Sequence, residues 1–79
     1  MIELKKIKRD NEQIACEAFI EDCNEPVNLS LNIRNKELNS FVLPPDYNWC
    51  TTHIDKAKDF LLSLLDVTDI PNKKRIMWY

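Results

Sequence analysis

The sequence predicts an α+β domain in which a four-stranded antiparallel meander sheet carries one amphipathic helix on one face. Three observations lead to this fold class. Apolar and polar residues alternate through the first half of the chain, with the period of two that is typical of half-buried strands. After residue 50 the apolar residues recur at helical spacing instead. The chain has 79 residues, which suits a single domain over 1–79 with one small core.

The first hairpin is predicted from strands at about 2–9 and 13–21, joined by a three-residue loop. This register places Lys5 opposite Glu17 and brings apolar residues opposite one another on a shared face. The first strand is basic and the residues that follow it are acidic. We therefore expect the two strands to neutralise each other, and we do not expect a basic patch here.

The second hairpin is predicted from strands at about 27–34 and 37–43 around a two-residue loop at 35–36. The stretch from Val27 to Arg34 alternates perfectly between apolar and polar residues. The predicted register places Leu29 opposite Val42. Two consecutive prolines follow the last strand and end it, because proline cannot donate to a sheet ladder.

The helix is predicted over about 53–67. Thr52 followed by Asp55 resembles a capping box at its start, and Pro71 stands beyond its end. The segment 73–79 is compatible with a fifth strand or with a docked arm. The apolar positions with helical spacing are Ile54, Ala57, Leu61, Leu64 and Leu65.

The chain contains no glycine. Turns must therefore use residues that adopt a positive φ less easily, and asparagine is the usual substitute. Asparagines fall at the predicted turns, at Asn11, Asn24, Asn35 and Asn72. The lack of glycine also excludes Gly-rich phosphate loops and dinucleotide-binding fingerprints.

The composition predicts a cytoplasmic, soluble globular domain without a cofactor. Hydrophobic residues make up 44% of the chain and charged residues 30%, with a net charge of −2. The sequence has no apolar run of signal-peptide or membrane-spanning length, so no membrane contact is expected. Three cysteines at irregular spacing do not form a disulfide framework and are expected as free thiols.

The segment 44–53 concentrates two aromatics, Cys50 and the single histidine, His53, in ten residues. A thiolate beside an imidazole at a helix start would form a nucleophilic dyad. A zinc site would need Cys16 and Cys23 as well, but their spacing is too wide for a zinc knuckle. No residue is identifiable that would orient the histidine. We therefore interpret the segment as a connector from sheet to helix, and we expect a protein that is not an enzyme.

A single helix can cover only one face of the sheet, so we expect an apolar surface on the other face. Ile7 and Ala15 are expected there beside larger apolar residues. This predicts a small interaction, adaptor or regulatory module that contacts a protein partner or a copy of itself as a homodimer. The candidate surface comprises Phe19, Phe41, Leu43, Trp78 and Tyr79.

Single-stranded nucleic acid is the alternative partner. The cations Lys73, Lys74 and Arg75 stand next to Trp78 and Tyr79 in the sequence, and cationic groups beside stackable rings are typical of such binding. The lysines of the first strand, together with Arg9, would extend this surface. The acidic isoelectric point of about 5.3 argues against a nucleic-acid partner.

Overall fold

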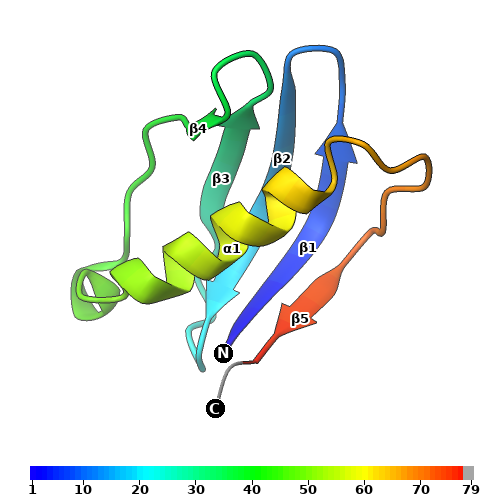
Figure 1. The fold of residues 1–79 in the computed structure, drawn as a ribbon. Helices are drawn as coiled ribbons and strands as arrows, with labels where there is room; N and C mark the ends of the chain where they lie inside the picture. Colours follow the sequence, from blue (N-terminus) through cyan, green and yellow to red (C-terminus); the bar gives the residue numbers. More distant parts are fainter. Residues whose placement is uncertain (78–79) are drawn as a thin grey trace.

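The computed structural model describes residues 1–77, and in them an open antiparallel sheet of five strands carries one helix across one face (Figure 1). The strand order is β4-β3-β2-β1-β5. The predicted α+β class is confirmed, and the C-terminal segment supplies the fifth strand beside β1. The elements are β1 (Ile2–Arg9), β2 (Gln13–Ile20), β3 (Val27–Asn32), β4 (Glu37–Leu38), the short 3₁₀ helix η1 (Pro45–Tyr47), α1 (Thr51–Ser63) and β5 (Lys74–Ile76).

The predicted register of the β1–β2 hairpin is confirmed near its open end, where Lys5 lies opposite Glu17. A β-bulge then shifts the register between Lys5 and Lys8, and Lys6 has a φ of 54°. One extra residue in a strand turns the following side chains to the other face. Ile7 therefore points under the helix and is buried, so the prediction that it lies on the opposite face is wrong.

The predicted register of the β3–β4 hairpin is also wrong. The structure pairs Leu31 with Leu38, so Leu29 has no partner at Val42. β4 ends at Leu38 and does not reach residue 43, because the chain leaves the sheet there. Val42 is 85% exposed as a result. A shift of two residues keeps every side chain on its own face, so alternation alone does not reveal it.

Side-chain hydrogen bonds from asparagine explain the wider loop between β3 and β4. The side-chain oxygen of Asn32 accepts the backbone N–H groups of Arg34 at 2.9 Å and Asn35 at 3.2 Å. Such local bonds stabilise a turn and compete with continued strand pairing. Asn32 and Asn35 thus shape this turn as acceptors, and none of the described asparagines has the positive φ that was predicted for the turns. The positive φ values belong to Lys6, Glu21 and Lys36.

The helix is shorter than predicted at its C-terminal end, and it begins two residues earlier. Its N-cap is Cys50, which makes no side-chain capping bond, so the predicted capping box at Thr52 is wrong. The chain tightens after Ser63, where the N–H of Leu64 bonds the carbonyl of Leu61 at 3.1 Å. Bonds of this i to i−3 type commonly end an α-helix.

Arg9, at the end of β1, binds the C-terminal end of α1. Its Nη1 donates to the carbonyl oxygens of Leu64 at 2.7 Å, Val67 at 2.9 Å and Leu65 at 3.3 Å. A cation here also interacts favourably with the partial negative charge at the helix end. One side chain therefore fixes the end of the helix against the sheet.

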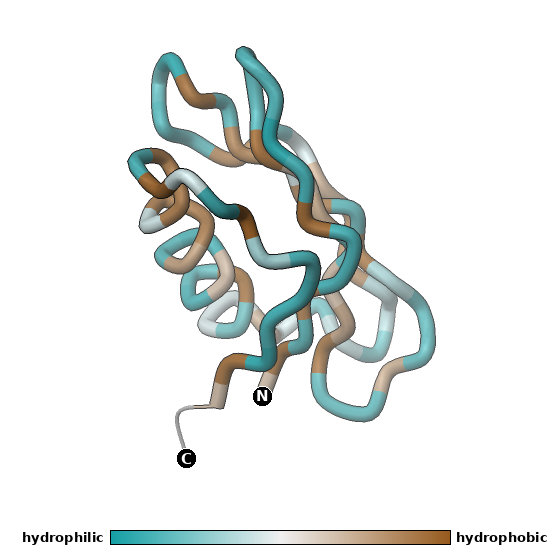
Figure 2. Tube along the Cα trace, turned by 90° about the vertical axis from the view of Figure 1, so that its right-hand side faces the viewer, coloured by the Kyte–Doolittle hydropathy of each residue, from teal (hydrophilic) through white to brown (hydrophobic). Residues whose placement is uncertain are grey.

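The core lies between α1 and the sheet, and Figure 2 shows the two layers with hydrophobic positions recurring along both. Leu4, Ile14 and Leu31 on the strands and Ala57 and Leu61 on the helix are completely buried. Within the described residues, no helix combines the length and apolar character needed to cross a membrane.

Candidate binding face

The segment 44–53 folds against the turn that joins β2 to β3. The Tyr47 hydroxyl donates to a carboxylate oxygen of Asp22 at 2.7 Å. His53 Nε2 lies 2.6 Å from Glu21 Oε1, and the same oxygen is 2.9 Å from the Met1 ammonium group. Two links from one segment to one turn fix where the helix begins, as a connector requires.

The thiol and imidazole in this segment are both buried. Burial raises the pKa of the Cys50 thiol, which disfavours the thiolate that a nucleophile needs. Cys16 lies apart on β2, and burial raises its pKa to about 12. Among residues 1–77, no three His, Cys, Asp or Glu side chains lie close enough together to hold a metal ion. Cys50 packs in the core, and His53 contacts Glu21 from the first turn of the helix.

The residues predicted to form an apolar surface do not share a sheet face. Phe19 lies half-buried on β2, on the face away from α1, and the Lys5 ammonium group sits 5.0 Å from its ring centroid. Phe41 lies in the irregular segment after β4, and Leu43 in that segment packs against the core. Trp78 and Tyr79 lie outside the described residues. Because β4 ends early, Phe19 has neither Phe41 nor Leu43 beside it in the sheet.

The basic residues of the C-terminal segment are also divided. Arg75 is opposite Glu3 on the face away from α1, whereas Lys74 points to the helix side, with its ammonium group 5.9 Å from the Phe60 ring. Lys73 and Lys74 still border a hollow at this edge of the sheet, together with Glu3, Lys5 and Arg75. Arg9 caps the helix and does not extend a basic surface.

We call the side of the sheet that α1 leaves uncovered the open face. Across β1, β2 and β5 it carries four cations and two carboxylates, and most of them are paired. Arg75 contacts Glu3 at 3.0 Å and Lys5 contacts Glu3 at 3.4 Å, while Lys6 is 3.7 Å from Glu17. The hydrogen bond from Arg75 is the main reason why the pKa of Glu3 is lowered. The predicted neutralisation between strands is therefore partial.

The cations of the open face stand further into solvent than its carboxylates. The side chains of Lys6, Arg75 and Lys5 are 72%, 61% and 49% exposed, whereas those of Glu17 and Glu3 are 31% and 26% exposed. An approaching molecule therefore meets ammonium and guanidinium groups first.

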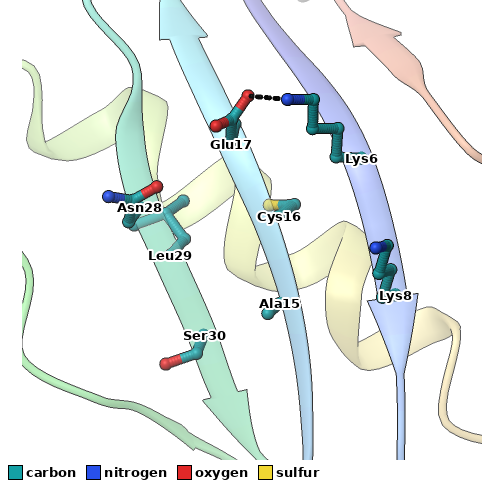
Figure 3. Close-up of a pocket in the computed structure, with 8 residues that line it drawn as sticks. All are labelled: Lys6, Lys8, Ala15, Cys16, Glu17, Asn28, Leu29 and Ser30. Atoms are coloured by element: carbon teal, nitrogen blue, oxygen red, sulfur yellow. Dashed lines mark ion pairs between the residues drawn. The ribbon is translucent and has the colours of Figure 1, made fainter.

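A hollow of about 270 Å³ lies on the open face at the bulge of β1 (Figure 3). Lys6 and Lys8 border it from β1, and Asn28 and Ser30 border it from β3. Ala15, Cys16 and Glu17 of the intervening strand β2 lie between these two walls. The sequence pattern did not predict this group of residues, because it is the β-bulge that places Lys6 and Lys8 on the open face beside Ala15.

One sequence signal for the hollow is a small residue in a strand whose neighbours on the same face are large. Ala15 stands between Gln13 and Glu17 on the open-face side of β2. Chemically, the lysines, Asn28 and Ser30 around the hollow can donate hydrogen bonds, and the lysines add positive charge. A comparison of the chain with protein-family models, with curated proteins and with solved structures found no match.

Proposed function

We propose that the protein is a non-enzymatic interaction module that binds an acidic segment of a protein partner on its open face. The observation that carries this proposal is the exposure of the cations above the recessed carboxylates around Phe19. Complementary charge speeds association and sets the orientation of a partner. The half-buried ring of Phe19 offers apolar contact beside the charges.

The existing ion pairs do not stand in the way of such a partner. Pairs between exposed side chains contribute only about 0–1 kcal/mol each, so exchanging one carboxylate partner for another costs little. Lys5, Lys6 and Arg75 are the exposed partners in the three pairs. An acidic segment can replace Glu3 and Glu17 as the acceptor without disturbing the core beneath.

A protein segment suits this face better than a nucleic-acid strand. The chain has a net charge of −2, which opposes a uniformly charged phosphate backbone more than a peptide of a few carboxylates. Binding of single strands relies on several stacked rings, and on the described part of the open face Phe19 is the ring that the strands provide.

The proposal is tested by fluorescence anisotropy with a labelled peptide of alternating Glu and Leu, and with a labelled single-stranded oligonucleotide, each at two salt concentrations. The double variant Lys5→Glu, Arg75→Glu is expected to weaken peptide binding by about tenfold or more, with a smaller effect at high salt. The matched control Lys56→Glu, Lys58→Glu changes the same net charge on the helix and is expected to bind normally.

Equal losses in both double variants would show that only net charge matters, and the proposed face would be rejected. Tighter binding of the oligonucleotide than of the peptide would make nucleic acid the partner. Sedimentation of the protein alone reports whether a second copy occupies the face, because such self-association would weaken in the Lys5→Glu, Arg75→Glu variant.

A further inference from the structure

The hollow at the bulge of β1 lies on the open face between lysines of β1 and polar residues of β3. We propose that it seats a phosphate group, carried by the acidic partner segment or bound as free phosphate. The first source rests on the function proposed above, and the second does not. The chemistry is the same in both cases, because a phosphate dianion accepts several hydrogen bonds and favours nearby ammonium groups.

Polar side chains border the hollow on two opposite sides. On one side Lys6 and Lys8 provide ammonium groups, and on the other lie the Asn28 amide, whose oxygen faces β2, and the Ser30 hydroxyl, which is turned away from β2 (Figure 3). Both side chains of β3 must rotate to donate to an anion in the hollow. Ser30 Oγ accepts a bond from the Asn39 amide at 2.8 Å, which leaves its own proton available to donate. A tetrahedral anion can use donors on both sides at once, whereas a planar carboxylate presents its two oxygens in one direction.

The shape of the hollow follows from two local features. Ala15 leaves space where its neighbours on β2 carry long side chains, and the bulge at Lys6 moves β1 out of its regular register. The volume of about 270 Å³ holds a phosphate with several waters, since one water occupies about 30 Å³ of liquid.

Both lysines are available to a ligand. Lys8 is exposed and takes part in no ion pair with the described residues. Lys6 is 72% exposed and meets Glu17 only at 3.7 Å, as the dashed line in Figure 3 marks. Glu17 borders the hollow and opposes an anion, so Lys6 must turn from this carboxylate to the phosphate. We therefore expect Glu17→Gln to increase the affinity for phosphate.

The experiment compares one acidic peptide in three forms, with serine, aspartate or phosphoserine at its centre, and adds inorganic phosphate as a separate probe. Affinity is measured by calorimetry, and binding at the hollow by amide NMR shifts of Asn28 and Ser30. The variants are Lys8→Gln, Glu17→Gln and Lys6→Asn, since asparagine tolerates the positive φ at this position. Lys56→Gln on the helix is the matched control.

We expect the phosphoserine peptide to bind about tenfold more tightly than the serine form, and clearly more tightly than the aspartate form. Lys8→Gln and Lys6→Asn should each remove most of this preference, Glu17→Gln should increase it, and Lys56→Gln should leave it unchanged. Shifts of Asn28 and Ser30 with inorganic phosphate alone, lost in Lys8→Gln, would instead identify free phosphate as the ligand and still support the seat.

The inference is overturned if phosphoserine gives no more affinity than aspartate and inorganic phosphate leaves both amides unmoved. In that case binding of all three peptides with equal affinity would leave the acidic-segment proposal standing. Failure of every peptide to bind would reject that proposal. The response of the two amides to inorganic phosphate would still show whether the hollow binds phosphate. The two proposals therefore fail by different measurements.

Discussion

Replacing Arg9 by methionine is expected to destabilise the protein more than any other single change of an exposed or half-buried cation. Methionine keeps an unbranched stem that can still pack, but it removes the group that binds the three carbonyl oxygens at the end of α1. The C-terminal turn of the helix would then lose its link to the β1–β2 hairpin, although the apolar core would stay intact.

The magnitude follows from two contributions. A cation at a helix C-terminus contributes about 0.3–1 kcal/mol, and loss of charge-assisted hydrogen bonds to carbonyls that water can partly replace costs about 1–1.5 kcal/mol more. The expected loss in the free energy of unfolding is about 2 kcal/mol. For a domain of this size the corresponding drop in Tm is about 8–16 °C. Since native stabilities are about 0.05–0.15 kcal/mol per residue, such a loss is a large share of the total.

Urea unfolding followed by circular dichroism measures this loss. Arg34→Met is the matched control, because Arg34 is exposed in the β3–β4 loop and its expected effect is below about 0.5 kcal/mol. Arg9→Lys should lose less free energy of unfolding than Arg9→Met and more than Arg34→Met, since lysine restores the charge but not the forked geometry of arginine. If Arg9→Met and Arg34→Met unfold at the same urea concentration, the assigned role of Arg9 is wrong.

Three further predictions concern other parts of the molecule. Lys36→Gly should raise the free energy of unfolding by about 0.5–1 kcal/mol, because a φ of 60° costs glycine nothing; a lower urea midpoint would contradict this. In native protein at pH 8, Ellman's reagent should modify the half-buried Cys23 first. It should reach Cys16 only on unfolding, because burial raises the pKa of that thiol to about 12. Simultaneous modification of both thiols would show that Cys16 is not buried. The bond from Tyr47 to Asp22 raises the phenol pKa to about 12, so its stabilising effect is full below pH 10 and is lost as pH rises towards 12. Plots of the free energy of unfolding against pH for wild type and Tyr47→Phe should therefore differ in slope in that window. Parallel plots would exclude the bond.

Alternation and charge sufficed to predict the register at the open end of the first hairpin, where Lys5 lies opposite Glu17, but not the register beyond the bulge. The bulge also leaves a trace in the sequence. Ile2 and Leu4 stand at even positions, but the next apolar residue is Ile7, at an odd one. A residue inserted between Leu4 and Ile7 places both side chains on the same face of the sheet. The change from even to odd positions was therefore a usable signal for the bulge.

The second hairpin was harder to predict because alternation is the same in registers that differ by two residues. The register is selected by the hydrogen bonds that the Asn32 side-chain oxygen accepts within the turn. These bonds widen the turn and bring Leu31 opposite Leu38. Turn chemistry of this kind depends on side-chain geometry and not on hydrophobic pattern.

The candidate site was predictable only in part, because its residues come from separate strands. The sequence identified Phe19 and Arg75, but not the pairing of β5 with β1 that sets Arg75 beside Glu3. Nor could it reveal that the lysines of β1 reach over a gap left by Ala15. The apolar surface predicted instead depended on a strand up to residue 43, which the structure does not form.

The pairing of Ile2 with Ile76 has a consequence for how the chain acquires its fold. On the ribosome, β1 emerges before β5 and waits for this second neighbour until the intervening strands and helix have been synthesised. Through that interval one side of the strand has open amide and carbonyl groups, which invite association with other nascent chains. Its lysines discourage such contacts by mutual repulsion. The positive charge that we assign to ligand binding would thus also protect the growing polypeptide.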